Sequence, residues 1–362
     1  MESKKIRVAI TQGDVNGIGY EIILKTFADP TILELCTPIV YGSPKIMTYH
    51  RKALDLPTMF TVVNAASEVQ EGHLNVVNCN DDEVKVELGQ PSEEAGKAAL
   101  QALERAVEDY KDGGWDVLVT APIDKKTIQS ETFKFNGHTE YIEERLGEGR
   151  KALMILAKDD LRIALATGHS AVSEVASTLT QDLLMEKITT FRESLKTDFA
   201  LANPRIAVLA LNPHAGDEGL LGAEEQDIIA PAVTEMRSKG ILCYGPFSSD
   251  GFFGAGSFSH FDGVLAMYHD QGLIPFKLLA MDEGVNFTAG LPVVRTSPDH
   301  GTAFDIAGKN LASEQSFRSA LYLAIDIFRH RHNETAIHRN PLKKLFFDKR
   351  DDSDKLKTDI AE

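Results

Sequence analysis

The stretch Val264–Lys277, VLAMYHDQGLIPFK, decides the fold, because a short apolar run ends in a polar turn that carries His269. Such a run predicts a buried strand of a parallel sheet that is covered on both faces. Two earlier stretches have the same form: RIALAT precedes His169, and RIAVLAL precedes His214. In open α/β sheets ligands bind beyond the carboxyl ends of the strands. We therefore expect the three histidines to converge on a functional site.

Composition and charge exclude several classes of protein. The chain has 362 residues, of which 43% are hydrophobic, so it is long enough for two domains or one large one. A net charge of −16 argues against nucleic acid or an anionic membrane as a partner. The three cysteines are widely spaced and form no C-x-x-C pair, which argues against a disulfide framework and predicts a cytoplasmic protein. We find neither a signal-peptide core nor an apolar run long enough to span a membrane.

Strand-like and helix-like patterns alternate along the whole chain, which predicts an α/β fold. The first strand leads into the glycine-rich turn Gln12–Glu21, QGDVNGIGYE, which suits either an anion at a helix start or an ordinary strand-to-helix turn. Residues 172–196 are expected to form one helix, and residues 300–308 a loop turning into a helix. The mixed-charge residues 348–362 are expected to be a disordered tail.

Three imidazoles with an open fourth position are typical of a catalytic divalent-metal site, which makes His169, His214 and His269 candidate ligands. A single histidine is more often a surface or satisfied core residue, so the prediction depends on the shared pattern. Asp270 and Asp250 are candidates for a metal ligand, a base or a group that orients a histidine, and the last role is favoured for Asp270.

Other polar residues have two interpretations each. His138 and Thr139 suit a proton shuttle with a hydroxyl donor beside it, or an ordinary helix start. Lys277 and Arg295 suit phosphate or carboxylate binding, or are solvated surface charges, and Asn286 lies between them in the sequence.

Six blocks of sequence, taken in order, resemble the signature blocks of the 4-hydroxythreonine-4-phosphate dehydrogenase family of pyridoxal 5′-phosphate biosynthesis. The resemblance runs from about residue 6 to residue 325. The blocks are Gly13-Asp14 with Gly17-Ile18-Gly19, Thr120-Ala121-Pro122-Ile123, Gly137-His138-Thr139-Glu140, Asn212-Pro213-His214-Ala215-Gly216, Ala266 to Gly272, and Arg295-Thr296-Ser297 with Asp299 to Ala303.

The resemblance implies a two-domain α/β fold of the isocitrate/isopropylmalate dehydrogenase type, with the active-site cleft between the domains. Residues 1–130 and 298–347 would form a nucleotide-binding domain, and residues 131–297 a domain for metal, substrate and dimerisation. It also implies a homodimer with the active site at the interface, NAD or alternatively NADP as cofactor, and one Zn, Mg or Co ion per site.

Site residues are implied position by position. The metal ligands would be the three histidines named above, one of them contributed across the dimer. The candidate catalytic residues are His138, Asp250 and Asp270. The substrate contacts would be His138, Thr139, Lys277, Asn286 and Arg295. The cofactor contacts would be Gly13, Asp14, His300, Gly301, Asp305 and Asn310.

The implied reaction is metal-assisted oxidation of 4-phosphohydroxy-L-threonine at C3, followed by decarboxylation to 3-amino-2-oxopropyl phosphate. A paralogue acting on threonate or erythronate 4-phosphate has nearly the same blocks, and an acyl-phosphate transferase of related fold is a further alternative. The chain departs from the family pattern at Val15-Asn16 and Tyr20, where the family has Pro-Ala and Pro, and at Asp124, where it has Asn. These departures concern the preferred substrate more than the class of reaction.

Overall fold

The chain is built on a single twelve-stranded sheet, with strand order β3-β4-β2-β1-β5-β12-β11-β6-β7-β10-β8-β9. The computed structural model describes residues 5–79 and 84–339, so the expected disordered tail lies outside the described residues. The strands are β1 Ile6–Thr11, β2 Cys36–Gly42, β3 Thr61–Val63, β4 Asn75–Asn78, β5 Val117–Thr120, β6 Leu153–Lys158, β7 Leu161–Leu165, β8 Ile206–Leu209, β9 Cys243–Phe247, β10 Gly263–Ala266, β11 Val285–Ala289 and β12 Val294–Pro298. The α-helices are α1 Gly19–Thr26, α2 Ile32–Leu35, α3 Pro44–Ala53, α4 Glu93–Lys111, α5 His138–Leu146, α6 Val172–Thr178, α7 Gln181–Thr197, α8 Ala230–Ser238, α9 Ser249–Gly254, α10 His269–Ala280 and α11 Gln315–Arg339.

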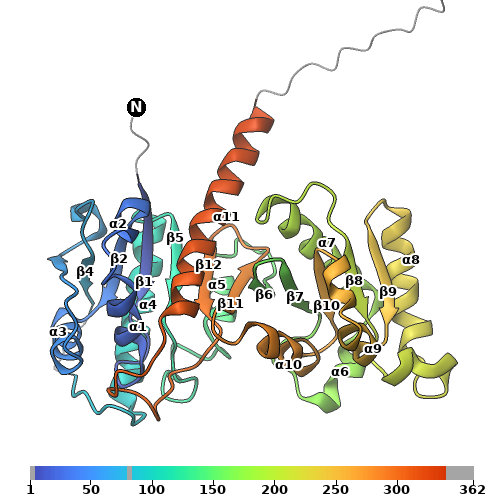
Figure 1. Ribbon diagram of the computed structural model, residues 1–362, viewed down its shortest axis with the longest axis horizontal. Helices are drawn as coiled ribbons and strands as arrows, with labels where there is room; N and C mark the ends of the chain where they lie inside the picture. The colour runs from blue at the N-terminus through green and yellow to red at the C-terminus, as the bar shows by residue number, and fades with distance from the viewer. Residues whose placement is uncertain (1–4, 80–83, 340–362) are drawn as a thin grey trace, which may run out of the picture.

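Two parallel halves of the sheet meet through antiparallel strands. The strands from β3 to β12 pair in parallel, and so do those from β7 to β9. Between them, β11 and β6 pair antiparallel with each other and with their outer neighbours. The hydrogen-bonded sheet therefore runs without a break from one half to the other (Figure 1). The expected limits of the two domains remain a prediction.

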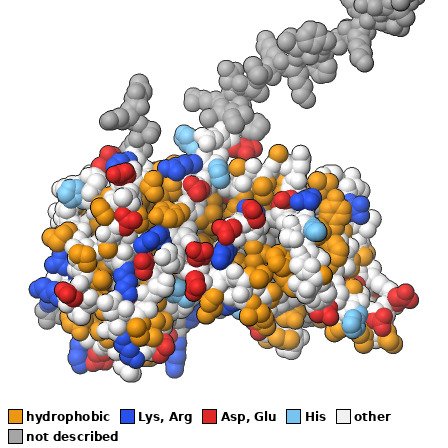
Figure 2. All heavy atoms as spheres, viewed as in Figure 1, with side chains coloured by type: hydrophobic (Ala, Val, Ile, Leu, Met, Phe, Trp, Pro, Cys, Tyr) orange, Lys and Arg blue, Asp and Glu red, His pale blue; other side chains and the backbone are white. Residues whose placement is uncertain are grey.

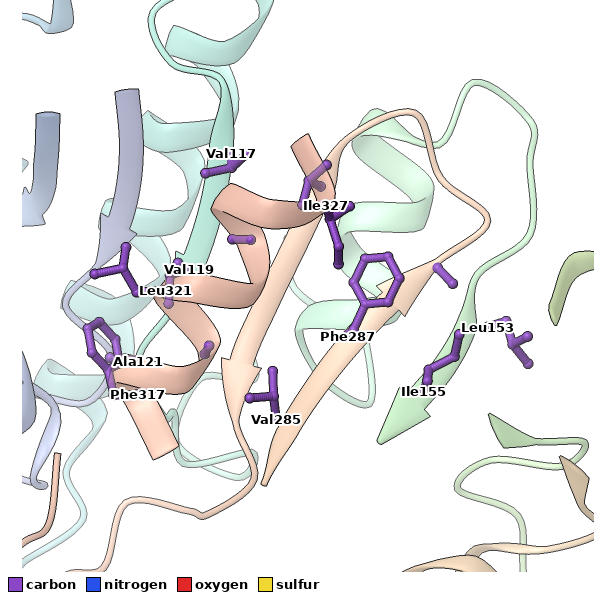
Figure 3. Close-up of a cluster of buried hydrophobic side chains, with 14 of the residues drawn as sticks. Val117, Val119, Ala121, Leu153, Ile155, Val285, Phe287, Phe317, Leu321 and Ile327 are labelled. Carbon is purple, nitrogen blue, oxygen red and sulfur yellow. The ribbon is translucent and has the colours of Figure 1, made fainter. Parts of the chain in front are cut away.

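Helix α11 covers one face of the central strands (Figure 3). Its Phe317 and Leu321 belong to the same buried cluster as Phe287 of β11 and Ile155 of β6, and all four side chains are fully buried. Burying a side chain of this size contributes about 1.5–3 kcal/mol, so this cluster holds the two halves together. Because side chains alternate along a strand, the neighbours of Phe287 and Ile155 point to the opposite face.

Two local expectations are wrong, each because of the backbone. Residues 172–196 form two helices, since Leu179 is extended and the Thr180 side chain caps α7 by accepting from Leu183 N at 3.1 Å. Residues 304–310 form successive turns and no helix, because Ala303, Gly308 and Asn310 have positive φ, which a right-handed helix does not allow.

On the surface, acidic and basic side chains are interspersed over the face drawn in Figure 2. Across residues 5–79 and 84–339, no helix combines the length and the apolar character needed to cross a membrane.

Candidate active site

A cavity of about 260 Å³ lies on the face of the central strands opposite α11, because its lining side chains alternate with those packed under that helix. Its floor includes Asn286 of β11, Leu156 of β6 and Arg295 of β12. Asn286 pairs in register with Leu156, and residues paired in this way point to the same face. The strand alternation that places Phe287 under α11 therefore places Asn286 in the cavity.

The walls come from segments that are far apart in the sequence. One wall is the loop after β5 together with the start of α5, and the other is α10 together with the loop after β7. The residues that follow β12 close a third side. The predicted site residues that line the cavity are His138, Thr139, His169, His269, Lys277, Asn286, Arg295, His300 and Gly301.

Arg295 is a buried cation whose partners within the cavity are all neutral. Its side chain donates to Thr120 Oγ1 at 2.6 and 3.2 Å and to Thr288 Oγ1 at 3.2 Å, and the residue is 3% exposed. In the described part of the chain it forms no ion pair with a carboxylate. Burial lowers the pKa of Arg295 to about 10, which leaves the guanidinium charged at neutral pH. Glu140 acts on Arg295 only from a distance, and a desolvated cation without a direct counter-charge is costly, so this site favours an anionic ligand.

Lys277 and Asn286 supply further polar groups. Lys277 Nζ lies 3.8 Å from Asp299 Oδ2, and burial raises the pKa of Asp299. Asn286 donates its amide to Met154 Sδ at 3.3 Å, while its buried Oδ1 has no hydrogen-bond partner among the residues described. A buried amide oxygen without a partner is unusual in a native structure and is explained by a ligand that donates to it.

His169 and His269 face each other across the cavity, with ring centroids 5.5 Å apart. A carboxylate lies near the Nδ1 atom of each ring: Glu140 at 3.8 Å from His169, and Asp270 at 2.7 Å from His269. Metal-binding histidines commonly donate one ring nitrogen to a carboxylate, which leaves the other nitrogen free to coordinate. These two side chains therefore fit a divalent cation, and Asp270 contacts the histidine that the sequence predicts it to orient.

His214 and Asp250 lie near each other but away from the cavity lining. The charge of His214 contributes to a lowered pKa for Asp250, after the larger effects of hydrogen bonds from Ser248 and from the Gly251 backbone. Within one chain, the described residues contain no group of three or more His, Cys, Asp or Glu arranged to hold a metal ion. The structure thus brings together two of the three predicted metal ligands.

The backbone that carries His214 is strained. Residues 214–218 all have positive φ, from 45 to 81°, and four of the five are not glycine. Each such residue costs on the order of 1 kcal/mol. Glu225 holds the preceding segment by accepting from Leu211 N and Asn212 N at 2.8 and 2.7 Å. His214 lies on this strained turn, with its side chain exposed to solvent.

His138 begins α5 and has a pKa well below its ordinary value of 6.5. Burial is the largest cause, followed by the positive charges of Arg295 and Lys125. Its imidazole is therefore neutral at physiological pH and has a lone pair available for a proton. Thr139 follows it on the same cavity wall.

The predicted cofactor residues fall into three groups. His300 and Gly301 line the cavity, and His300 Nε2 is buried with no hydrogen-bond partner in the described structure. Asp305 and Asn310 lie on exposed turns beyond it. Gly13 and Asp14 are buried outside the cavity lining.

Gly13 and its neighbours have a packing role. A Cβ atom on Gly13, whose φ is 70°, would lie 2.3 Å from Pro122 O, so only glycine fits there. The glycine-rich turn also contacts the block after β12, since Ile18 N donates to Thr302 O at 3.1 Å. The turn therefore positions two loops that border the cavity.

The sequence interpretation gave no role to Lys125, Glu140, Thr120 or Asp299, which also line the cavity. All four lie within or next to the resembling blocks, and that proximity was the available signal. Two departures from the family pattern prove to be structural. Asn16 bonds Gln90 O, Ser92 Oγ and Glu87 N, and the Tyr20 hydroxyl bonds Gln12 and the Ser43 backbone.

A family model described as pyridoxal phosphate biosynthetic protein PdxA matches residues 34–324. The chain belongs to this family. A 4-hydroxythreonine-4-phosphate dehydrogenase of Bacteroides thetaiotaomicron is 66% identical over 362 residues, which cover 100% of each chain.

Solved structures confirm the expected fold. A 4-hydroxythreonine-4-phosphate dehydrogenase from Klebsiella pneumoniae matches with a TM-score of 0.77 at 33% identity, covering 91% of this chain and 99% of that one. A terephthalate 1,2-cis-dihydrodiol dehydrogenase from Burkholderia xenovorans LB400 matches with a TM-score of 0.58 at 26% identity, covering 89% and 98%. The PdxA fold is thus shared with a dehydrogenase named for a different substrate.

Proposed function

We propose that the chain catalyses the NAD-dependent oxidation of 4-phosphohydroxy-L-threonine at C3, followed by decarboxylation to 3-amino-2-oxopropyl phosphate, in pyridoxal 5′-phosphate biosynthesis. Membership of the PdxA family and the name of the 66% identical relative support the reaction. The observation that carries the proposal is the buried guanidinium of Arg295, which faces the cavity without a carboxylate partner.

The phosphate would be held by Arg295 and Lys277, and the unpartnered Oδ1 of Asn286 would accept a hydrogen bond from a donor of the substrate. Arg295 offers a planar, charged donor, and Lys277 adds a second positive charge from α10. Fixing one end of the substrate on the rigid floor orients the rest toward the two histidines. Such positioning is itself a large part of catalysis.

A divalent cation would be held by His169 and His269 of one subunit and His214 of a second. An exposed apolar face of α10 beside the cavity supports pairing with a second copy. On it Ile274, Leu278 and Met281 recur at helical spacing and are 60, 82 and 77% exposed. His214 and Asp250, which lie away from the cavity of their own chain, would then serve the partner's cavity.

NAD⁺ or NADP⁺ would lie along the residues that follow β12, with His300 and Gly301 at the cavity end and Asp305 and Asn310 at the exposed end. The unpartnered Nε2 of His300 supports a polar ligand at this position. Gly13 and Asp14 would support the cofactor loop from behind, through the contact between the glycine-rich turn and Thr302.

The chemistry follows from these positions. The cation would lower the pKa of the substrate hydroxyl, and the nicotinamide would accept the hydride from C3. Neutral His138 would accept the hydroxyl proton, and the positive charges of Arg295 and Lys125 keep it from being protonated beforehand. Asp270 would hold His269 in the tautomer that leaves its Nε2 free.

The decisive assay is NADH formation from 4-phosphohydroxy-L-threonine, with and without a chelator. Threonate 4-phosphate and erythronate 4-phosphate serve as competing substrates. We expect turnover of the amino acid that stops with chelator and returns with Zn²⁺, Mg²⁺ or Co²⁺. A preference for either competing substrate would identify a paralogue, and turnover insensitive to chelator would rule out the cation.

A further inference from the structure

Lys125 projects into the cavity from a loop whose backbone is held in place. The Gln129 side-chain amide donates to Lys125 O at 3.1 Å and to Phe135 O at 2.8 Å. Asp124 Oδ1 accepts from Lys126 N at 3.0 Å and from Thr127 N at 2.8 Å. Because the backbone is fixed in this way, the Lys125 side chain places Nζ at 3.3 Å from His169 Nε2.

Lys125 differs from the other two cations of the cavity in its partner. Lys277 lies beside the carboxylate of Asp299, and Arg295 is held by threonine hydroxyls. The Lys125 ammonium approaches Nε2 of His169, and in residues 5–79 and 84–339 it forms no ion pair with a carboxylate. Like Arg295, Lys125 can therefore accept an anion.

The nitrogen that Lys125 contacts is also the one that the proposed cation would use. Glu140 lies near Nδ1 of His169, so Nε2 carries the lone pair. An ammonium and a metal ion cannot share one lone pair. Two such positive charges remain close only when an anion lies between them.

The proposed substrate supplies that anion. It carries a phosphate at one end and a carboxylate at the other. The carboxylate is bonded to the carbon that bears the amine, next to the carbon that bears the reacting hydroxyl. With the phosphate on Arg295 and Lys277 and the hydroxyl near the two histidines, the carboxylate would lie within reach of Lys125, whose Nζ is 3.3 Å from His169 Nε2.

We propose that Lys125 binds the carboxylate of the substrate and so selects phosphorylated 2-amino acids over the corresponding amino alcohols. This inference rests on the proposed function. The carboxylate leaves as neutral CO₂, so the contact is strongest before decarboxylation and is lost as the product forms. Lys125 therefore contributes to substrate binding more than to the chemical step.

The test compares two ligands and three variants in the metal-loaded enzyme without NAD. The ligands, followed by calorimetry, are 4-phosphohydroxy-L-threonine and 3-amino-2-hydroxypropyl phosphate, which lacks the carboxylate. The variants are Lys125→Met, Lys125→Arg and the control Lys126→Met, which removes the same charge from the adjacent residue outside the cavity lining.

We expect Lys125→Met to weaken binding of the amino acid by about 10- to 100-fold, the range of one charge-assisted hydrogen bond, and to leave the amino alcohol within about threefold. Lys125→Arg restores most of the loss, and in turnover assays Lys125→Met raises KM while kcat changes little. Equal weakening of both ligands, or none for the amino acid, would overturn the assignment. Absence of turnover by the wild-type enzyme would instead refute the proposed function itself.

Discussion

Replacing Arg295 by Met tests whether a buried charge is kept for function at the expense of stability. Met replaces the aliphatic stem of Arg with an unbranched side chain that carries no charge. Arg295 has no carboxylate partner in the described chain, so the substitution removes a desolvated cation and leaves two threonine hydroxyls without a donor.

The magnitudes follow from the structure. Burial lowers the pKa of Arg295 from 12.5 to about 10, which corresponds to a cost of about 3 kcal/mol for keeping the side chain charged. Losing the bonds to Thr120 and Thr288 costs about 1 kcal/mol each. The two effects oppose each other, so we expect the free energy of unfolding to change by less than about 2 kcal/mol. Anion binding loses its charged anchor and should weaken by about 3 kcal/mol, or roughly 150-fold.

Two measurements on the same protein decide the matter. Urea denaturation gives the free energy of unfolding, and calorimetry gives the affinity for 4-phosphohydroxy-L-threonine and for inorganic phosphate. Arg105→Met is the matched control, because Arg105 is ion-paired with Asp109 on α4, away from the cavity. If Arg295→Met unfolds the protein or binds both anions as tightly as the wild type does, Arg295 is a structural residue and the reasoning fails.

Three further predictions concern other contacts. Asp14 is buried and its pKa is raised from 3.8 to about 6, chiefly by burial; the native carboxyl therefore binds its proton more tightly than the unfolded one. The free energy of unfolding should fall as pH rises from 3.8 to about 6. Asp14→Asn should therefore raise the free energy of unfolding by about 3 kcal/mol near pH 7 and change it very little near pH 4. Glu140→Gln should lower the affinity for Zn²⁺ or Co²⁺ by about 10- to 100-fold in a competition titration, because the carboxylate near His169 Nδ1 is lost. Arg331→Met should lower the free energy of unfolding, measured by urea denaturation, by about 3 kcal/mol. The substitution leaves the Asp198 carboxylate, which is 2% exposed, without its ion-pair partner at 2.6 Å.

Each of these predictions has a control. The free energy of unfolding of Asp14→Asn is compared with that of the wild type at both pH values. Equal gains at the two would mean that the pKa of Asp14 is not raised in the native protein. Glu144→Gln changes an exposed carboxylate on the same helix and should leave metal affinity unaltered. Arg329→Met breaks the surface pair with Asp326 and should cost less than about 1 kcal/mol. Equal losses of unfolding free energy in Arg331→Met and Arg329→Met would show that the buried ion pair stabilises the protein no more than the surface pair does.

Much of the local structure follows from the order of residues alone. Apolar runs predict β7, β8 and β10, because a strand covered on both faces must be apolar at successive positions. The polar turns after them are equally local, so the sequence was sufficient to place His169, His214 and His269 near strand ends. The start of α4 also has a local cause, since the Ser92 side chain accepts from Ala95 N as a capping residue does.

The break between α6 and α7 and the turns at 304–310 were not predictable from pattern. Residues 172–196 contain neither Gly nor Pro to mark a break, and the capping side chain of Thr180 is the one local feature at the break itself. Ala303 and Asn310 have positive φ angles, and at Ala303 such an angle is contrary to the local preference of the residue type.

The cavity itself depends on pairings that no single segment specifies. The sequence determined an α/β chain with histidines and basic residues in polar turns. The tertiary structure decided that antiparallel β11 and β6 join the two halves, which places Asn286 and Arg295 on the face opposite α11. It also placed Lys125 and Glu140 on either side of His169 and left His214 apart from the other two histidines. The physical reason is that strand register and the contacts between distant loops are set by burying both faces of one sheet at once, which is a property of the whole chain.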